Sequence, residues 1–213
     1  MRIVMFGPPG AGKGTQAVLL SRKYKVPHIS TGAILRDAIA ARTNVGIIAE
    51  GFMDKGNLVP DEIVLIIVKE KLLSDCKDGF ILDGFPRTIS QAEGLDLILK
   101  ETKQPLEKVI DLDLSDNAII HRLSQRLVCP CCGESYNLES KSPKNNEICD
   151  ICFTHLLRRS DDDPKSIATR LCDYNAKTAP LLDYYEKSEL LLKVKADGNI
   201  EDIHNNIVKA LGL

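Results

Sequence analysis

The stretch MRIVMFGPPGAGKGTQAVLLSRKY, residues 1–24, decides the fold of this chain. The apolar run at residues 2–6 predicts a strand, and the run from Thr15 to Tyr24 has the pattern of a helix. Between them, glycines let consecutive backbone N–H groups curl around phosphate oxygens without Cβ clashes, and the helix N-terminus adds the positive end of its dipole. Strand, glycine-rich turn and helix in this order predict a phosphate-binding loop.

The lysine of this loop, Lys13, can reach the outer phosphates of a bound nucleotide, so a nucleoside triphosphate is the expected ligand. The general pattern places Ser or Thr directly after the lysine. Here Gly14 stands before Thr15, so the match to that pattern is imperfect.

A second segment, DGFILDGFPRT at residues 78–88, joins an apolar strand to polar residues at its end. Asp83 follows the strand from Phe80 to Leu82, at the carboxyl edge where open parallel sheets bind ligands. We expect Asp83 to hold Mg²⁺, directly or through water, beside the phosphates. Arg87 follows on a turn fixed by Gly and Pro and is suited to a bidentate grip on a phosphate. The alternative is an acid at a strand end with an unrelated surface arginine.

Four arginines farther along the chain are further candidates for contacts with phosphate. Arg122 and Arg126 are four residues apart in DNAIIHRLSQRL, a helical pattern that would place them on one face. Arg159 closes the cysteine-rich segment, and Arg170 lies on the next predicted helix. Phosphoryl transfer needs positive charge around a largely dissociative transition state, so converging arginines fit this chemistry. Each of them could equally be an exposed surface residue.

Two C-x-x-C pairs predict a metal site. Cys129 pairs with Cys132 and Cys149 pairs with Cys152, and a β-hairpin over residues 133–148 would bring the four thiolates together. A tetrahedral Zn²⁺ would then replace the hydrophobic core that this polar segment cannot build, and with four protein ligands it would stabilise and not catalyse. Reduced free thiols and a redox pair are the alternatives.

The other three cysteines are not expected to bind the metal. Cys131 is two places after Cys129 and one before Cys132, so it is the residue that could compete as a ligand, and we expect it to point outward. Cys76 and Cys172 stand alone in helical patterns and are expected to be buried.

Length, charge and the first residues narrow the class of protein. A chain of 213 residues suits one α/β domain with an insertion. A net charge of −2 argues against a broad nucleic-acid surface, and no apolar run approaches the roughly 20 residues that span a bilayer. Because the first strand begins at residue 2, we expect no removable signal peptide, and we expect a cytoplasmic location with reduced thiols.

Apolar strands alternate with helical runs along the chain, which predicts an α/β fold with a parallel sheet and right-handed crossovers. Helix starts are expected at Pro60 and between Asp163 and Pro164. The expected strands are residues 2–6, 26–29, 80–82, 109–114 and 190–194. Two segments interrupt the alternation, so we divide the chain into a core (1–29, 60–126 and 161–213), a flap (30–59) and a lid (127–160).

Taken together, these motifs give a highly specific resemblance over essentially all 213 residues. The chain resembles the adenylate kinases, of the long bacterial type with a zinc-bearing lid. The resemblance rests on GPPGAGKGT (7–15), HISTGAILR (28–36), GNLVPDEIV (56–64), DGFPRTISQAE (83–93), the paired C-x-x-C lid, RRSDDD (158–163) and TRLCDYNAKTAPLLDYY (169–185).

The resemblance implies a P-loop NTPase-like α/β fold, in which helices flank a parallel five-stranded sheet. A small helical AMP-binding flap and a zinc-ribbon-like β lid would be attached to it. The implied activity is reversible, Mg²⁺-dependent transfer of the γ-phosphoryl group of ATP to AMP, giving two ADP, with structural Zn²⁺ in the lid. The implied protein is a cytoplasmic monomer that binds neither nucleic acid nor membranes.

The resemblance also implies roles for individual residues on the ATP side. Five cationic side chains would act in phosphoryl transfer: Lys13, Arg87, Arg122, Arg159 and Arg170. ATP would contact Gly7, Gly10, Ala11, Gly12, Lys13, Gly14, Thr15, Arg126, Ser135, Tyr136 and Gly198.

On the AMP side, the Gln91 amide can donate to and accept from an adenine edge as few side chains can. Asp161 and Asp162 would orient arginines in the closed state. AMP would contact Thr31, Arg36, Asn57, Leu58, Val59, Gly84, Phe85, Pro86, Arg87, Gln91, Arg159 and Arg170.

Two positions depart from the family pattern, which often has Asp where Ala33 stands and Gly where Phe153 follows the last cysteine. The first departure would alter polarity on the AMP side, and the second would alter packing of the lid.

Two other functions compete with this interpretation. A kinase for CMP, UMP or GMP would share most of the phosphate-binding parts, although Gln91 and Thr31 favour adenine. From another class, the cysteine insert could be a nucleic-acid or protein docking module on an inert nucleotide-binding fold. Its segment GESYNLESKSPKNNE, residues 133–147, contains just two lysines and one aromatic residue, too few for a stacking and phosphate surface.

Overall fold

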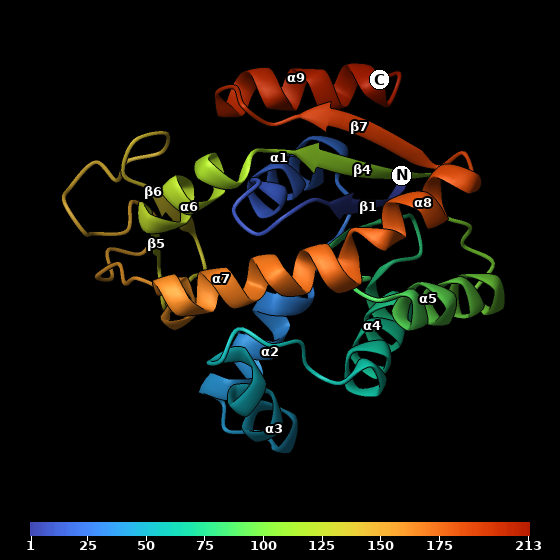
Figure 1. The fold of residues 1–213 in the computed structure, drawn as a ribbon, viewed down its shortest axis with the longest axis horizontal. Coiled ribbons are helices and arrows are strands. Elements are labelled where there is room, and N and C mark those ends of the chain that lie inside the picture. The colour runs from blue at the N-terminus through green and yellow to red at the C-terminus, as the bar shows by residue number, and fades with distance from the viewer.

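The computed structural model describes residues 1–213 and contains one central sheet with five parallel strands. The strands lie in the order β2-β3-β1-β4-β7, and helices cover both faces of the sheet (Figure 1). This arrangement confirms the predicted α/β fold. The strands are β1 (Arg2–Phe6), β2 (His28–Ser30), β3 (Phe80–Asp83), β4 (Lys108–Asp113) and β7 (Leu191–Lys195).

The helices belong to the two layers around the sheet and to the flap, and most begin or end within a few residues of a strand. Short 3-10 and π-helical turns precede and follow α7, at η1 (Ser160–Asp162) and η2 (Tyr174–Thr178). The α-helices are α1 (Lys13–Tyr24), α2 (Thr31–Ala40), α3 (Asn44–Met53), α4 (Asp61–Asp75), α5 (Ile89–Glu101), α6 (Asp116–Ser124), α7 (Pro164–Asp173), α8 (Pro180–Lys187) and α9 (Ile200–Ala210).

Alternation along the strands divides the buried residues into two cores. On β1, Val4 and Phe6 pack with helices α4, α5 and α8, whereas Ile3 and Met5 pack with α1, α6 and α9. Both sets are buried, with exposed fractions of 2% or less. A sheet covered on both faces explains why these strands are apolar throughout and do not alternate between polar and apolar residues.

Side chains that accept hydrogen bonds from backbone N–H groups fix several helix starts. Asp163 accepts from Lys165 and Ser166, with Pro164 in the first turn of α7, as the sequence predicts. Pro60 precedes the first residue of α4, as the sequence predicts, but makes no side-chain cap.

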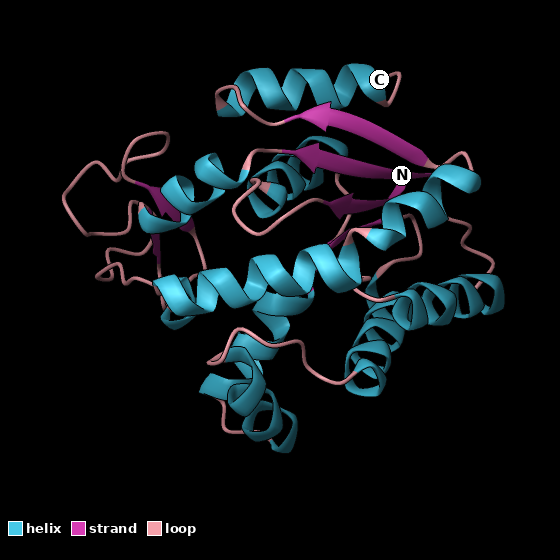
Figure 2. Cartoon of the chain, in the orientation of Figure 1, coloured by secondary structure: helices cyan, strands magenta, loops and turns pink.

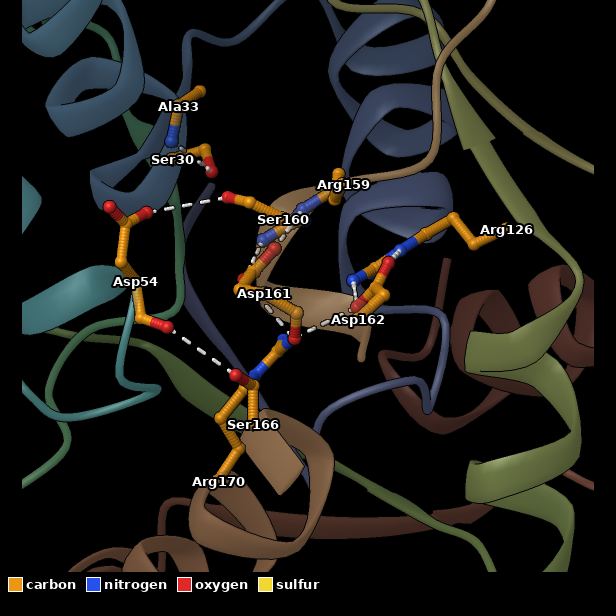
Figure 3. Close-up of polar contacts among 10 residues, drawn as sticks. All are labelled: Ser30, Ala33, Asp54, Arg126, Arg159, Ser160, Asp161, Asp162, Ser166 and Arg170. Carbon is orange, nitrogen blue, oxygen red and sulfur yellow. Dashed lines mark hydrogen bonds and ion pairs between the residues drawn. The ribbon is translucent and has the colours of Figure 1, made fainter. Parts of the chain in front are cut away.

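Helices α2 and α3 form a helical flap that lies beside α7 (Figure 1). The two helices pack so closely that a Cβ atom at Gly46 would lie 2.0 Å from the Ala38 carbonyl oxygen. Asp54, the C-cap of α3, accepts hydrogen bonds of 3.4 Å from Ser160 in the 3-10 turn and from Ser166 in the first turn of α7 (Figure 3). The flap therefore touches the segment that joins the lid to the core.

The lid is mostly loop, with short strands β5 (Arg126–Val128) and β6 (Ser135–Asn137) (Figure 2). These strands pair as an antiparallel hairpin around the first C-x-x-C turn. The predicted hairpin over residues 133–148 is therefore wrong: its first part pairs backward with β5, and residues beyond β6 form turns. The lid core has just five buried residues: Leu127, Cys129, Tyr136, Cys149 and Leu156.

The two C-x-x-C turns have the same backbone conformation. The residue after each second cysteine, Gly133 or Phe153, donates its N–H to the carbonyl of the first cysteine, at 3.1 and 3.0 Å. Both residues have left-handed backbones, with φ of 72° at Gly133 and 60° at Phe153. This conformation suits glycine and strains a bulky side chain. Phe153 is also 75% exposed, so packing does little to offset that strain.

Two smaller sequence predictions fail in the structure. Cys76 is buried, as predicted, but Cys172 is exposed on α7. Arg122 and Arg126 do not share a helix face, because α6 ends at Ser124 and Arg126 begins β5. None of the helices combines the length and the apolar character needed to cross a membrane.

Replacing Phe153 with glycine should stabilise the second C-x-x-C turn. Relief of the left-handed strain, about 1–2 kcal/mol, exceeds the entropic cost of a new glycine, about 0.5–1 kcal/mol. We expect hydrogen exchange of the lid amides, measured by NMR or mass spectrometry, to slow by about two- to fivefold. The matched control is Ile151→Gly, in the same turn and also exposed but without a left-handed backbone, which should speed exchange. Faster exchange in Phe153→Gly would show that the aromatic ring itself stabilises the turn.

Candidate active site and lid metal centre

The loop between β1 and α1 lies at the carboxyl end of the sheet and packs closely against the backbone of β4. A Cβ atom at Gly7, where φ is 127°, would lie 2.7 Å from the Leu112 carbonyl oxygen of β4. Gly12, at the N-cap of α1, also has a positive φ and makes no side-chain cap. The first N–H groups of α1 are thus left for an external acceptor, as in an anion-binding helix terminus.

Lys13 lies at the centre of this loop. Its ammonium group donates to the carbonyl oxygens of Gly7 and Pro8, both at 2.7 Å. Burial lowers the pKa of Lys13 to about 7, and the nearby Asp83 carboxylate opposes that shift. An anionic ligand in the loop would favour the charged form.

Asp83 ends β3 beside the loop and is 9% exposed. Burial would raise its pKa, but a hydrogen bond from His28 and the charge of Lys13 lower it overall. The distance between His28 Nε2 and Asp83 Oδ2 is 3.4 Å. The carboxylate is therefore ionised, and it lies near Gly14, whose Cβ would be 3.3 Å from Asp83 Oδ2. An ionised carboxylate beside a phosphate loop is a suitable ligand for Mg²⁺.

Three of the predicted arginines meet at the base of the lid (Figure 3). Arg126 donates from Nε to Asp162 at 2.7 Å, and Arg159 donates from Nε to Asp161 at 2.8 Å. Arg170 lies between these two pairs and contacts Asp162 Oδ1 at 3.0 Å and Asp161 Oδ2 at 3.1 Å. The two aspartates therefore bind the three guanidinium groups into one cluster.

The charge in this cluster extends to the flap and to the loop after β3. Burial, together with the charge of Arg159, lowers the pKa of Arg36 to about 10, and burial lowers the pKa of Arg126 to the same value. Burial also lowers the pKa of Arg87. Although burial alone would raise it, the charges of Arg159 and Arg170 hold the pKa of Asp161 far below its usual range. Such shifts accompany functional sites more often than ordinary surfaces.

Arg122 does not join this cluster. Its guanidinium group donates to the carbonyl oxygens of Ala196 at 2.7 Å and Gly198 at 3.4 Å, in the loop between β7 and α9. It therefore lies beside Gly198, which the family resemblance implies borders the ATP, and away from the other arginines. The separation follows from the end of α6 at Ser124, which turns Arg126 into the lid.

A cavity opens between the flap and the loop after β3, and it collects most of the residues predicted for the second nucleotide. Arg36 lies next to it, where its guanidinium group would be 3.2 Å from a Cβ atom at Gly32. Phe85 and Pro86 are buried and do not line the cavity, so they support the loop and do not present side chains to a ligand. The lining residues are Thr31, Gly32, Leu35, Met53, Asn57, Leu58, Val59, Val64, Gly84, Arg87 and Gln91.

A hydrogen-bond network that the sequence does not reveal holds the Arg87 loop. Arg87 donates from Nε to the Gly84 carbonyl at 2.7 Å, and its own carbonyl accepts from Thr178 at 2.9 Å. Thr31 donates to the same Gly84 carbonyl at 3.0 Å. Gly84 belongs to the loop itself, whereas Thr31 comes from α2 and Thr178 from the π-helical turn, so two separate segments fix the loop.

The lid brings together the four predicted ligands, whose sulfur atoms all lie within 4.8 Å of one another. Cys129 and Cys152 are 3.2 Å apart, and Cys132 and Cys149 are 3.5 Å apart. Bonds of about 2.3 Å to a tetrahedral Zn²⁺ place sulfur atoms about 3.8 Å apart, so the donor set fits this ion. Cys131 is exposed and outside the group.

Tyr136 belongs to the lid core, beside the cysteine cluster. Its side chain is 3% exposed, so a contact with the adenosine, which stays a prediction, would have to use its backbone; its neighbour Ser135 is half-buried. The hydroxyl accepts from the N–H of Asp150 at 2.8 Å and lies 3.5 Å from Cys149 Sγ. Because the oxygen accepts from Asp150, its proton is free to be donated to the Cys149 thiolate.

Comparison with known proteins agrees with this geometry. A family model described as adenylate kinase matches residues 5–190. The chain belongs to the adenylate kinase family. Adenylate kinases of Caldicellulosiruptor bescii (46% identical, covering 100% of both chains) and Acetivibrio thermocellus (49% identical, 99% of this chain and 98% of the relative) are similar over their whole lengths. That of Methanococcoides burtonii is 47% identical, over 99% of this chain and 98% of the relative.

Membership of the adenylate kinase family makes the protein a nucleoside monophosphate kinase, a phosphotransferase. The glycine-rich loop, the arginine cluster and the cavity beside the flap all lie at the carboxyl edge of the sheet, where open parallel sheets bind ligands.

The lowered pKa of Lys13 predicts that nucleotide binding takes up a proton above pH 7. Free Lys13, with a pKa of about 7, is mostly neutral at pH 8, and bound phosphates favour its charged form. We expect calorimetric titration with ATP at pH 8, in buffers of different ionisation enthalpy, to show uptake of close to one proton. Uptake should vanish in Lys13→Arg, whose side chain stays charged. Equal enthalpies in all buffers for the unsubstituted protein would mean that Lys13 is already protonated.

Removing only the hydroxyl of Tyr136 should weaken metal binding in the lid. Hydrogen bonds to ligands typically contribute about 10- to 100-fold in metal affinity, so we expect Tyr136→Phe to lose zinc to a chelator at correspondingly lower concentrations. The control is Tyr184→Phe, whose hydroxyl donates to Asp96 far along the chain. If Tyr136→Phe keeps its zinc but raises the KM for ATP, the side chain serves the nucleotide after all.

Proposed function

We propose that this protein transfers the γ-phosphoryl group of Mg-ATP reversibly to AMP, giving two ADP. The observation that supports this reaction is the arginine cluster, whose charges act both on Lys13 in the glycine-rich loop and on Arg87 in the wall of the cavity. Positive charge at the meeting point of two nucleotides is what transfer between two phosphates requires.

ATP would bind with its phosphates on the loop from Gly7 to Thr15, held by backbone N–H groups and by Lys13. Its base would lie near Gly198 and Arg122, because that guanidinium group is fixed against the β7–α9 loop. Lid residues reach this side through Arg126 and Ser135. ATP would therefore lie across the carboxyl ends of β1 and β4.

AMP would occupy the cavity beside the flap. Its phosphate would face Arg36, Arg87 and the cluster that contains Arg159 and Arg170, and its base would face Gln91. Backbone groups of residues 57–59, which line the cavity, would border the ribose and base. The AMP phosphate would then point toward the γ-phosphate of ATP.

In the reaction, an oxygen of the AMP phosphate forms a bond to the γ-phosphorus while the bond from that phosphorus to the β–γ bridging oxygen breaks. The acceptor oxygen is already anionic, so no general base is needed. Lys13, Arg87, Arg126, Arg159 and Arg170 would stabilise charge on the equatorial and leaving oxygens. Closure of flap and lid would exclude the water that would otherwise hydrolyse ATP.

Two metal ions complete the proposal. Mg²⁺ would be held near Asp83, directly or through water, and supplies charge neutralisation at the β- and γ-phosphates when bound. Zn²⁺ would be held by Cys129, Cys132, Cys149 and Cys152 and would stabilise the lid without taking part in the chemistry. All proposed site residues come from one chain, so a monomer would suffice.

The decisive experiment supplies Mg-ATP with AMP, CMP, UMP or GMP in separate assays and measures the nucleoside diphosphate formed. We expect AMP to exceed the other acceptors in kcat/KM by well over tenfold, because a site that hydrogen-bonds one base leaves polar groups unpaired with another. An equal or higher kcat/KM for CMP, UMP or GMP would contradict the proposal that AMP is the preferred acceptor, while the assignment of the phosphate-binding residues would stand.

A further inference from the structure

The amide of Gln91 is held by two neighbours of opposite character. Its Nε2 donates to Asp61 Oδ1 at 2.7 Å, and its Oε1 accepts from the backbone N–H of Arg87 at 2.7 Å. Gln91 is 2% exposed and lines the cavity beside the flap. Both ends of the amide are therefore engaged before any ligand enters.

This pair of contacts fixes which end of the amide is oxygen and which is nitrogen. An ionised carboxylate only accepts hydrogen bonds, and a backbone N–H only donates. Rotating the amide of Gln91 by 180° would place its oxygen against Asp61 and its NH₂ group against the Arg87 N–H. Both contacts would become repulsive, so one orientation is enforced.

One N–H and one lone pair of the Gln91 amide remain for a ligand. A 6-aminopurine offers an acceptor at N1 and a donor at its amino group, which match an amide in one orientation. A 6-oxopurine offers a donor at N1 and an acceptor at O6, so it matches the rotated amide. The enforced orientation can therefore distinguish the two classes of purine.

We propose that Asp61 is a specificity-determining positioning residue, which fixes the Gln91 amide so that the cavity accepts 6-aminopurine and rejects 6-oxopurine monophosphates. The inference rests on the proposed function and adds a residue to it. Asp61 does not line the cavity, so it acts through Gln91.

A second contact makes Asp61 a rigid partner. Its Oδ2 accepts from the Thr88 hydroxyl at 2.7 Å, and the same hydroxyl accepts from the backbone N–H of Gln91 at 3.1 Å. Asp61 is the first residue of α4, and Thr88 caps the start of α5. The carboxylate thus ties the starts of two helices together and holds both the side chain and the backbone of Gln91.

The test compares kcat/KM for AMP and for inosine monophosphate in Asp61→Ala and in its matched control, Glu62→Ala. Glu62 is the next residue in the same helical turn and is exposed, so its loss removes a similar charge without touching Gln91. We expect Asp61→Ala to lower the preference for AMP over inosine monophosphate by about tenfold, mainly through a higher KM for AMP. Glu62→Ala should leave the preference unchanged, and Asp61→Asn, which keeps one acceptor for Nε2, should restore most of it.

The outcomes separate the two proposals. If the unsubstituted protein does not phosphorylate AMP, the proposed function fails and this inference fails with it. If it prefers AMP and Asp61→Ala lowers both activities in parallel, Asp61 is structural and only the inference fails. Circular dichroism and thermal unfolding of each variant show whether the fold is retained. Should Asp61→Ala unfold, the test uses Thr88→Val, which removes one contact to the same carboxylate and should lower the preference for AMP. An unchanged preference in Thr88→Val overturns the inference.

Discussion

Repulsion among buried cations at the carboxyl edge of the sheet is the constraint on which the arrangement of this site depends. Lys13, Arg36 and Arg87 lie close enough to the arginine cluster for these charges to lower one another's pKa values, in addition to the effect of burial. Like charges brought together in a medium of low dielectric are costly unless anions accompany them. The chain supplies part of that compensation itself, through Asp83, Asp161 and Asp162, and leaves the remainder to a ligand.

The aspartates of the 3-10 turn decide how this compensation is shared. Asp161 and Asp162 are the counterions of the guanidinium groups that the proposed phosphoryl transfer would need, so they would compete with a bound phosphate for these groups. Phosphate can replace a carboxylate at an arginine because both accept paired N–H bonds in one plane. The ion pairs thus hold the arginine side chains in place through bonds that a phosphate could replace. A phosphate could therefore take over the guanidinium groups without rearrangement of the backbone.

The parts of the molecule that the sequence predicts are those that depend on neighbours along the chain. Residues a few positions apart determine four of these features: the alternation of strands with helices, the glycine-rich loop, the Asp163 cap and the cysteine pairs. The end of α6 does not: its last carbonyls accept from Asn137 and Arg158 in the lid. The contact between Asp61 and Gln91 spans 30 residues, and Tyr136 is buried because the five-residue lid core needs its ring. Such long-range partners leave no local pattern, so sequence analysis placed Arg126 on the wrong element, did not foresee the burial of the Tyr136 side chain and did not identify Asp61.

The lid links its own stability to the geometry of the arginines, because its first strand begins with Arg126 and its last turn leads into Arg159. Between these residues the chain buries few apolar side chains, so the orientation of both guanidinium groups rests on the hairpin and on the four sulfur atoms. A metal bound by these four sulfur atoms would not contact the phosphates, yet it would help to fix the positions of Arg126 and Arg159, two proposed phosphate ligands. Loss of order in the lid would release Arg126 and Arg159 while leaving Lys13, Arg87 and Arg170 on the core, so the loop could still hold a nucleotide after the transfer site had been lost.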